Sequence, residues 1–109
     1  AANGSITLDR IEAEAYAEIF AKNGTQPWIT ALKGALGESF SSGGIRACAL
    51  ALSCVKGALP PTCGLYNPLA QLKFVRRHEE KIEINNALLA GISFGGTYVY
   101  LVLGKCPDT

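Results

Sequence analysis

The chain has 109 residues, of which 49% are hydrophobic and 17% charged, a balance that is typical of one globular domain and excludes a disordered chain. Ten Lys and Arg side chains against nine Asp and Glu side chains give a formal net charge of +1. This balance provides no electrostatic footprint for nucleic acid or an anionic membrane surface, so we expect neither as a partner.

The cysteines and the histidine argue against a metal site. The four cysteines form no CxxC pair, and the single histidine, His78, lies in the charged run "RRHEEK". Zinc sites need closely spaced thiolates or imidazoles, so we expect no metal and no other cofactor. Cys48 and Cys54 are interpreted as small apolar residues of a helix in a reducing compartment, which favours a cytoplasmic location. No signal peptide is evident in "AANGSITLDRIEAEAY".

The first predicted element is a surface helix with one buried face. Asp9 and Glu12 have the spacing of a capping box, and "NG" at Asn23 and Gly24 would end the helix. The residues of its apolar stripe are Leu8, Ile11, Ala15 and Ile19.

A short strand and a second helix follow. "PWITALK", Pro27 to Lys33, is typical of a strand that starts at a proline, and "ESFSSGG" after it supplies loop residues. The segment from about Gly43 to Lys56 is apolar almost all round, which predicts a central helix enclosed by other protein. Gly57 is suited to cap that helix, and the two prolines of "GALPPT" prevent its continuation.

The last third of the chain predicts strands. A strand at Leu72 to Val75 is weakly indicated, whereas the stretch from Ile84 to Gly104 contains no charge and has nearly the length of a membrane-spanning helix. Its "GGT" and its β-branched and aromatic second half favour two strands instead, at about Ala87 to Phe94 and Thr97 to Leu103. Continuous apolar runs of this kind predict strands that are covered on both faces.

Two helices are few for such a sheet. Large apolar surfaces that stay uncovered usually mark an interface, so we expect these residues to belong to a larger assembly or to a longer chain.

Four motifs in one register resemble the C-terminal half of a β-ketoacyl synthase, an acyl-condensing enzyme of the thiolase fold. They are "LDRIEAEAYAEIF", "KGALGES" followed by "SSGG", "GALPPT", and "SFGGTYVYLVL". The resemblance implies one domain over residues 1–109 with an α/β fold, in which a mixed sheet packs against helices. It also implies that this domain is incomplete without an N-terminal half, which in the family supplies a cysteine nucleophile.

The family's two catalytic histidines have no counterpart here. The second stands in a KxxxGH motif, and Lys33, Gly37 and Glu38 match that motif with glutamate in place of histidine. The first stands in HGTGT, and an alignment anchored on Asp9 and Glu12 places Ala1 there, or Asn3 after a two-residue shift. Because the loss of one oxyanion donor alone slows such enzymes about 10²–10³-fold, we expect no catalytic residue in this chain.

Loss of both histidines on a retained scaffold resembles the chain-length factor, the silent partner of an active ketosynthase. "AANGSITLDRIEAEA" and "SSGG" resemble that subgroup, whereas "KGALG" follows the active enzymes, so an active synthase with an altered site stays the alternative. A third hypothesis is a free-standing acyl-binding or structural module, since resemblance of fold does not settle function. The expected partners are an active ketosynthase, the N-terminal half and, indirectly, acyl carrier protein. The candidates for structural or site-lining roles are Lys33, Phe94, Gly95, Gly96 and Thr97.

Overall fold

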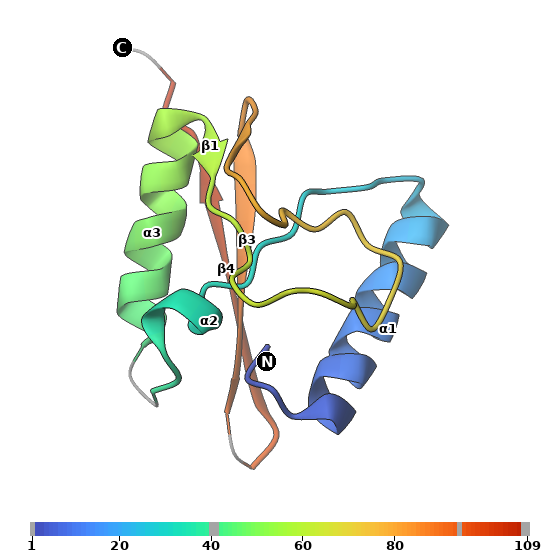
Figure 1. Ribbon diagram of the computed structural model, residues 1–109. Helices are drawn as coiled ribbons and strands as arrows, with labels where there is room; N and C mark the ends of the chain where they lie inside the picture. The colour runs from blue at the N-terminus through green and yellow to red at the C-terminus, as the bar shows by residue number, and fades with distance from the viewer. Residues whose placement is uncertain (1, 40–41, 94, 108–109) are drawn as a thin grey trace.

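The computed structural model of the protein describes residues 2–39, 42–93 and 95–107. Two residues singled out in the sequence, Ala1 and Phe94, lie outside this range. The described elements, in chain order, are α1 (Ile6–Asn23), α2 (Lys33–Leu36), α3 (Gly43–Lys56), β1 (Ala58–Leu59), β2 (Glu80–Lys81), β3 (Asn86–Ser93) and β4 (Thr97–Gly104). In Figure 1, α3 lies along one side of the β3–β4 hairpin and α1 stands apart on the other side.

The uncharged stretch near the C-terminus forms the β3–β4 hairpin, as predicted. Its strands are antiparallel and in register from Asn86 opposite Gly104 to Ser93 opposite Thr97. Gly95 and Gly96 in the turn have φ angles of 79° and 78°, which other residue types rarely adopt. Among the described residues, no helix is long and apolar enough to cross a membrane.

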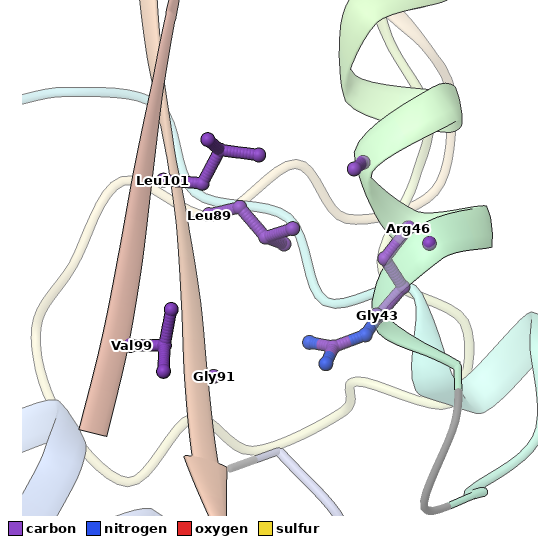
Figure 2. A pocket seen from close by; sticks show the side chains of 8 residues that line it. Gly43, Arg46, Leu89, Gly91, Val99 and Leu101 are labelled. Atoms are coloured by element: carbon purple, nitrogen blue, oxygen red, sulfur yellow. The ribbon is translucent and has the colours of Figure 1, made fainter. Parts of the chain in front are cut away.

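The prediction of α3 is confirmed at both ends. The helix runs from Gly43 to Lys56, and Gly57 caps it in the left-handed conformation with φ of 64°. Only Leu50, Ser53 and Cys54 of this helix are buried. Within this chain one face of α3 packs on β3 (Figure 2) and the opposite face is open, so the predicted enclosure of α3 by other protein stays a prediction.

The start of α1 differs from its prediction. The helix begins at Ile6, one turn earlier than expected, and its N-cap residue Ser5 makes no side-chain capping hydrogen bond. Asp9 instead accepts hydrogen bonds from the backbone N–H groups of Asn3 and Gly4. The helix ends at Asn23 with Gly24 as its cap, as predicted.

The buried face of α1 is also different. Tyr16 and Phe20, which stack with ring centroids 5.8 Å apart, lie on the partly buried side of the helix. All four residues of the predicted stripe are exposed, namely Leu8, Ile11, Ala15 and Ile19. Tyr16 and Phe20 each come one residue after a member of the predicted stripe, and successive residues of a helix are rotated by about 100° around its axis. The inward face therefore lies about 100° from the predicted stripe, which is left uncovered.

The predicted strands at 27–33 and 72–75 shrink to one parallel bridge between Ile29 and Phe74. The structure therefore has two separate antiparallel pairs, β1–β2 and β3–β4, rather than one mixed sheet. The β1–β2 pair, with two residues in each strand, has no sequence signal. The described core is correspondingly small, and its members are Cys54, Leu59, Val75 and Ile84.

The apolar surfaces expected from the sequence are present. Val102 on β4 is 64% exposed, Val55 on α3 is 81% exposed and Ile11 on α1 is 60% exposed. Seven of the eight residues of β4 are exposed within this chain, so the predicted cover on both faces of the strands would have to come from other protein. The exposed side of β4 that carries Val102 is called the β4 face below.

Candidate functional site

The motif "KGALGE" forms one short helical turn closed by an ion pair. Lys33 opens α2, and Gly37, with φ of 84° and ψ of 165°, ends it in a conformation that a side chain would strain. This reversal brings Glu38 back toward Lys33, with Oε2 2.8 Å from Nζ. The side chain of Lys33 is 12% exposed and that of Glu38 is 50% exposed. The residue at the second histidine position is thus held by the lysine of the same motif.

The segment after α3 holds this turn in place. Thr62 is buried, and its hydroxyl accepts a hydrogen bond from the backbone N–H of Ala31, while Thr30 donates to the carbonyl of Pro60. Gly34 lies so close to Cys63 that a Cβ at position 34 would be 2.5 Å from the Cys63 carbonyl oxygen. Contacts from the end of the "GALPPT" motif and from the next residue, Cys63, therefore hold the residues at the start of α2 in place.

The loop before α1 is held by a carboxylate. Asp9 accepts from Asn3 N–H at 3.3 Å through Oδ1 and from Gly4 N–H at 3.0 Å through Oδ2. The side-chain oxygen of Asn3 accepts from Ser5 N–H at 3.0 Å, which closes a tight local turn. The segment that resembles the HGTGT region is therefore shaped by backbone and carboxylate contacts.

These two regions border the same cleft. The cleft has a volume of about 1000 Å³, and its lining includes Asn3, Lys33, Glu38, Arg46 and Cys63. The structure thus brings together three of the residues picked out from the sequence, Asn3, Lys33 and Glu38. Gly95, Gly96 and Thr97 lie at the hairpin turn and do not line this cleft.

The titratable groups in the described lining of the cleft are carboxylates, a lysine, an arginine, a tyrosine and a cysteine. This lining contains no histidine, and His78, the one histidine of the sequence, is exposed in a loop elsewhere. Burial, and secondarily the charge of Tyr100, raises the pKa of Tyr16 above its usual value of 10.0, so this phenol stays protonated at neutral pH. Its hydroxyl donates to Glu12 at 3.2 Å. Nothing described in the cleft matches an imidazole as a proton carrier near pH 7.

Metal binding has no support in the described part of the chain. No three His, Cys, Asp or Glu side chains there come together in a group that could hold an ion. The cysteines are free thiols, with Cys54 buried and Cys48, Cys63 and Cys106 exposed. Cys54 is thus the apolar core residue that was predicted, whereas Cys48 lies on the open side of α3.

Two contributors to the site were not found from the sequence. Thr62 stands directly after two prolines, a place where a buried hydroxyl could have been suspected. Asp9 was assigned to a helix cap, although its carboxylate orders the loop that precedes the helix.

The comparison with known proteins identifies the family, although the two imidazoles of its motifs are replaced in this chain. Residues 1–66 match the family described as "Beta-ketoacyl synthase, C-terminal domain", so the chain belongs to this family and the thiolase-like fold is implied. The chain is 32% identical over 100 residues to 3-oxoacyl-acyl-carrier-protein synthase 1 of Buchnera aphidicola subsp. Acyrthosiphon pisum (strain APS).

That alignment covers 89% of this chain and 24% of the relative, so the chain spans about a quarter of the relative's length. No solved structure matches the chain.

Proposed function

We propose that the protein is a noncatalytic subunit or fragment, similar to a chain-length factor, that pairs with an active ketosynthase of fatty acid or polyketide biosynthesis. Its role is steric: it completes the partner's apolar surfaces and helps to shape the tunnel in which the acyl chain lies. The condensation itself takes place in the partner, which also binds acyl carrier protein.

The ion pair between Lys33 and Glu38 is the observation that carries this proposal. A carboxylate at the second histidine position cannot donate a proton to a developing enolate, and its charge repels one. With Glu38 bound to the Nζ of Lys33 at 2.8 Å, both polar groups of the motif are engaged with each other. This pairing supports a motif that serves as a structural turn and does not act as a proton donor.

The open apolar faces support a partner. One side of β4 carries every second residue of the strand, here Tyr98, Tyr100 and Val102, whose exposed fractions are 60%, 54% and 64%. Side chains of this kind aligned on one face of a strand are typical of a surface that another polypeptide covers. The alternative is an active synthase with an altered site, and the retained "KGALG" pattern favours it. In that case an N-terminal half would cover the same surfaces.

Co-purification and condensation assays separate these possibilities. Co-expressed with an active ketosynthase, the protein is expected to elute as a heteromer and to add no condensing activity of its own. Val102→Asp on the β4 face should prevent co-elution, whereas Tyr66→Asp, at a loop residue that is 81% exposed, should leave it intact. A monomer beside the ketosynthase would defeat the proposal, and condensation by the protein alone would favour the alternative.

A further inference from the structure

The chain contains an Asn-Gly pair at each end of α1. Asn3 and Gly4 lie in the loop before the helix, and Asn23 and Gly24 lie at its C-terminal end. All four residues are exposed, and the two glycines have positive φ angles of 87° and 64°. An asparagine before a glycine is prone to cyclise, because no Cβ obstructs the attack of the glycine nitrogen on the asparagine side chain. The two pairs therefore offer one reaction in two different surroundings.

In the first pair, the attacking nitrogen already faces a base. Gly4 N–H donates to Oδ2 of Asp9 at 3.0 Å, and Oδ1 of the same carboxylate accepts from Asn3 N–H at 3.3 Å. An amide nitrogen becomes a nucleophile only as it loses its proton. A carboxylate at hydrogen-bond distance from that proton meets the geometric condition for a general base.

The side chain under attack is held as well. Oδ1 of Asn3 accepts a hydrogen bond from Ser5 N–H at 3.0 Å. This contact is an Asx turn, which folds the asparagine side chain back alongside the peptide group that links Asn3 to Gly4. When the nitrogen adds to Cγ, negative charge develops on Oδ1, and a backbone donor that already points at this oxygen stabilises the charge.

The second pair is held differently. Nδ2 of Asn23 donates to the carbonyl oxygen of Ile19 at 2.8 Å, which keeps the side chain against the last turn of the helix. Gly24 N–H donates to the carbonyl oxygen of Ala21 at 3.3 Å. A backbone carbonyl is a far weaker base than a carboxylate, so the nitrogen of Gly24 keeps its proton.

We propose that Asn3 is a site of spontaneous deamidation, with Asp9 as the base. Oδ2 of Asp9 takes the proton of Gly4 N–H as this nitrogen forms a bond to Cγ of Asn3. The Cγ–Nδ2 bond then breaks, and Nδ2 takes up the proton and leaves as ammonia. Water opens the resulting succinimide at either carbonyl group, which gives aspartate or isoaspartate at position 3. Water is the one co-reactant, and the proposal does not depend on pairing with a ketosynthase.

The product would change the charge of the loop. A carboxylate at position 3 would lie close to Asp9, whose Oδ1 is 3.3 Å from the backbone nitrogen of Asn3, and like charges repel. Asn3 also lines the large cleft together with Lys33 and Glu38. Deamidation would therefore add a negative charge to the wall of the cleft as the protein ages.

The test compares the two pairs within one protein. The folded protein is incubated at neutral pH in water enriched in heavy oxygen, so that each deamidation during the incubation adds one labelled oxygen atom. Tryptic peptides that end at Arg10 and at Lys33 then report on Asn3 and Asn23 separately by mass spectrometry. Asn3 is expected to react at least tenfold faster than Asn23, and at least as fast as in the protein unfolded by guanidinium chloride. Equal rates of the two pairs in the folded protein, or a slower reaction of Asn3 in the folded than in the unfolded protein, would overturn the proposal.

A variant tests the base. Asp9→Asn keeps a hydrogen-bond acceptor and removes the carboxylate, so deamidation at Asn3 should slow at least tenfold while the rate at Asn23 stays the same; fragment masses separate positions 3 and 9. Glu14→Gln, at an exposed carboxylate of α1, is the control and should change neither rate. A carboxylate that only restrained the loop would speed the reaction when removed, so an unchanged or faster rate at Asn3 would refute the role of Asp9. The comparison of the two pairs uses the unmodified protein and remains decisive for Asn3 if the variant fails to fold.

Discussion

A double-mutant cycle on Lys33 and Glu38 measures how far the ion pair holds the α2 turn. The perturbations are Lys33→Met, Glu38→Gln and the two combined, which remove the charges and keep most of the side-chain volume. Glutamine keeps the shape of Glu38, and methionine keeps much of the apolar stem of Lys33. The cycle isolates the pairwise energy if neither variant makes new contacts.

The expected coupling energy lies between two limits. At 2.8 Å, Coulomb's law gives about 1.5 kcal/mol in bulk water and about 6 kcal/mol at an effective dielectric constant of 20. Glu38 is half exposed, so solvent screening and the entropy of holding the two side chains bring the net value near that of exposed pairs, about 0.2–1 kcal/mol. Because Lys33 is only 12% exposed, we expect about 1 kcal/mol, the upper end of this range.

Thermal unfolding followed by circular dichroism provides the assay. For a domain of this size, 1 kcal/mol corresponds to a shift in Tm of about 4–8 °C. Glu38→Gln should lower Tm more than Lys33→Met, since it leaves the more buried ammonium group without its partner. Additive effects of the two substitutions, with no coupling energy, would refute the view that the pair closes the turn.

Three further predictions test the packing of the site and the core. Gly34→Ala should lower the free energy of unfolding by about 1–3 kcal/mol in chemical denaturation, because its Cβ would be 2.5 Å from the Cys63 carbonyl oxygen. The control, Gly44→Ala, places a Cβ with nothing within 4 Å and should not destabilise the protein. Equal effects of the two substitutions would contradict the close packing of Gly34 against Cys63. Since the raised pKa of Tyr16 means that the folded state favours the neutral phenol, its contribution to stability is present below pH 10.0 and is lost as the pH rises through the folded pKa. Tyr16→Phe should remove this part of the fall in the free energy of unfolding at alkaline pH, as measured by denaturation curves at several pH values. An unchanged dependence of stability on pH in this variant would contradict the raised pKa of Tyr16. Cys54 should resist alkylation until the protein unfolds, as followed by mass spectrometry, and its modification under native conditions would contradict its burial. The thiols expected to react in the folded protein are Cys48, Cys63 and Cys106.

Local signals in the sequence determined much of this protein. Gly24 and Gly57 fixed the ends of α1 and α3, because a helix commonly ends where a glycine adopts the left-handed conformation. The β-branched and aromatic run after Gly95 and Gly96 determined the hairpin and its turn. The replacement of the second motif histidine by Glu38 was likewise readable from the order of residues.

Only the tertiary structure decided which faces are covered and which charges meet. The inward face of α1 carries Tyr16 and Phe20 rather than the more apolar stripe one residue away, since hydrophobic periodicity marks a face but not what packs on it. The Ile29–Phe74 bridge depends on a contact across more than forty residues, which short-range propensity does not specify. The pairing of Lys33 with Glu38 and the contact of Arg46 with the Ala90 carbonyl oxygen depend in the same way on turns and packing that bring separate groups together.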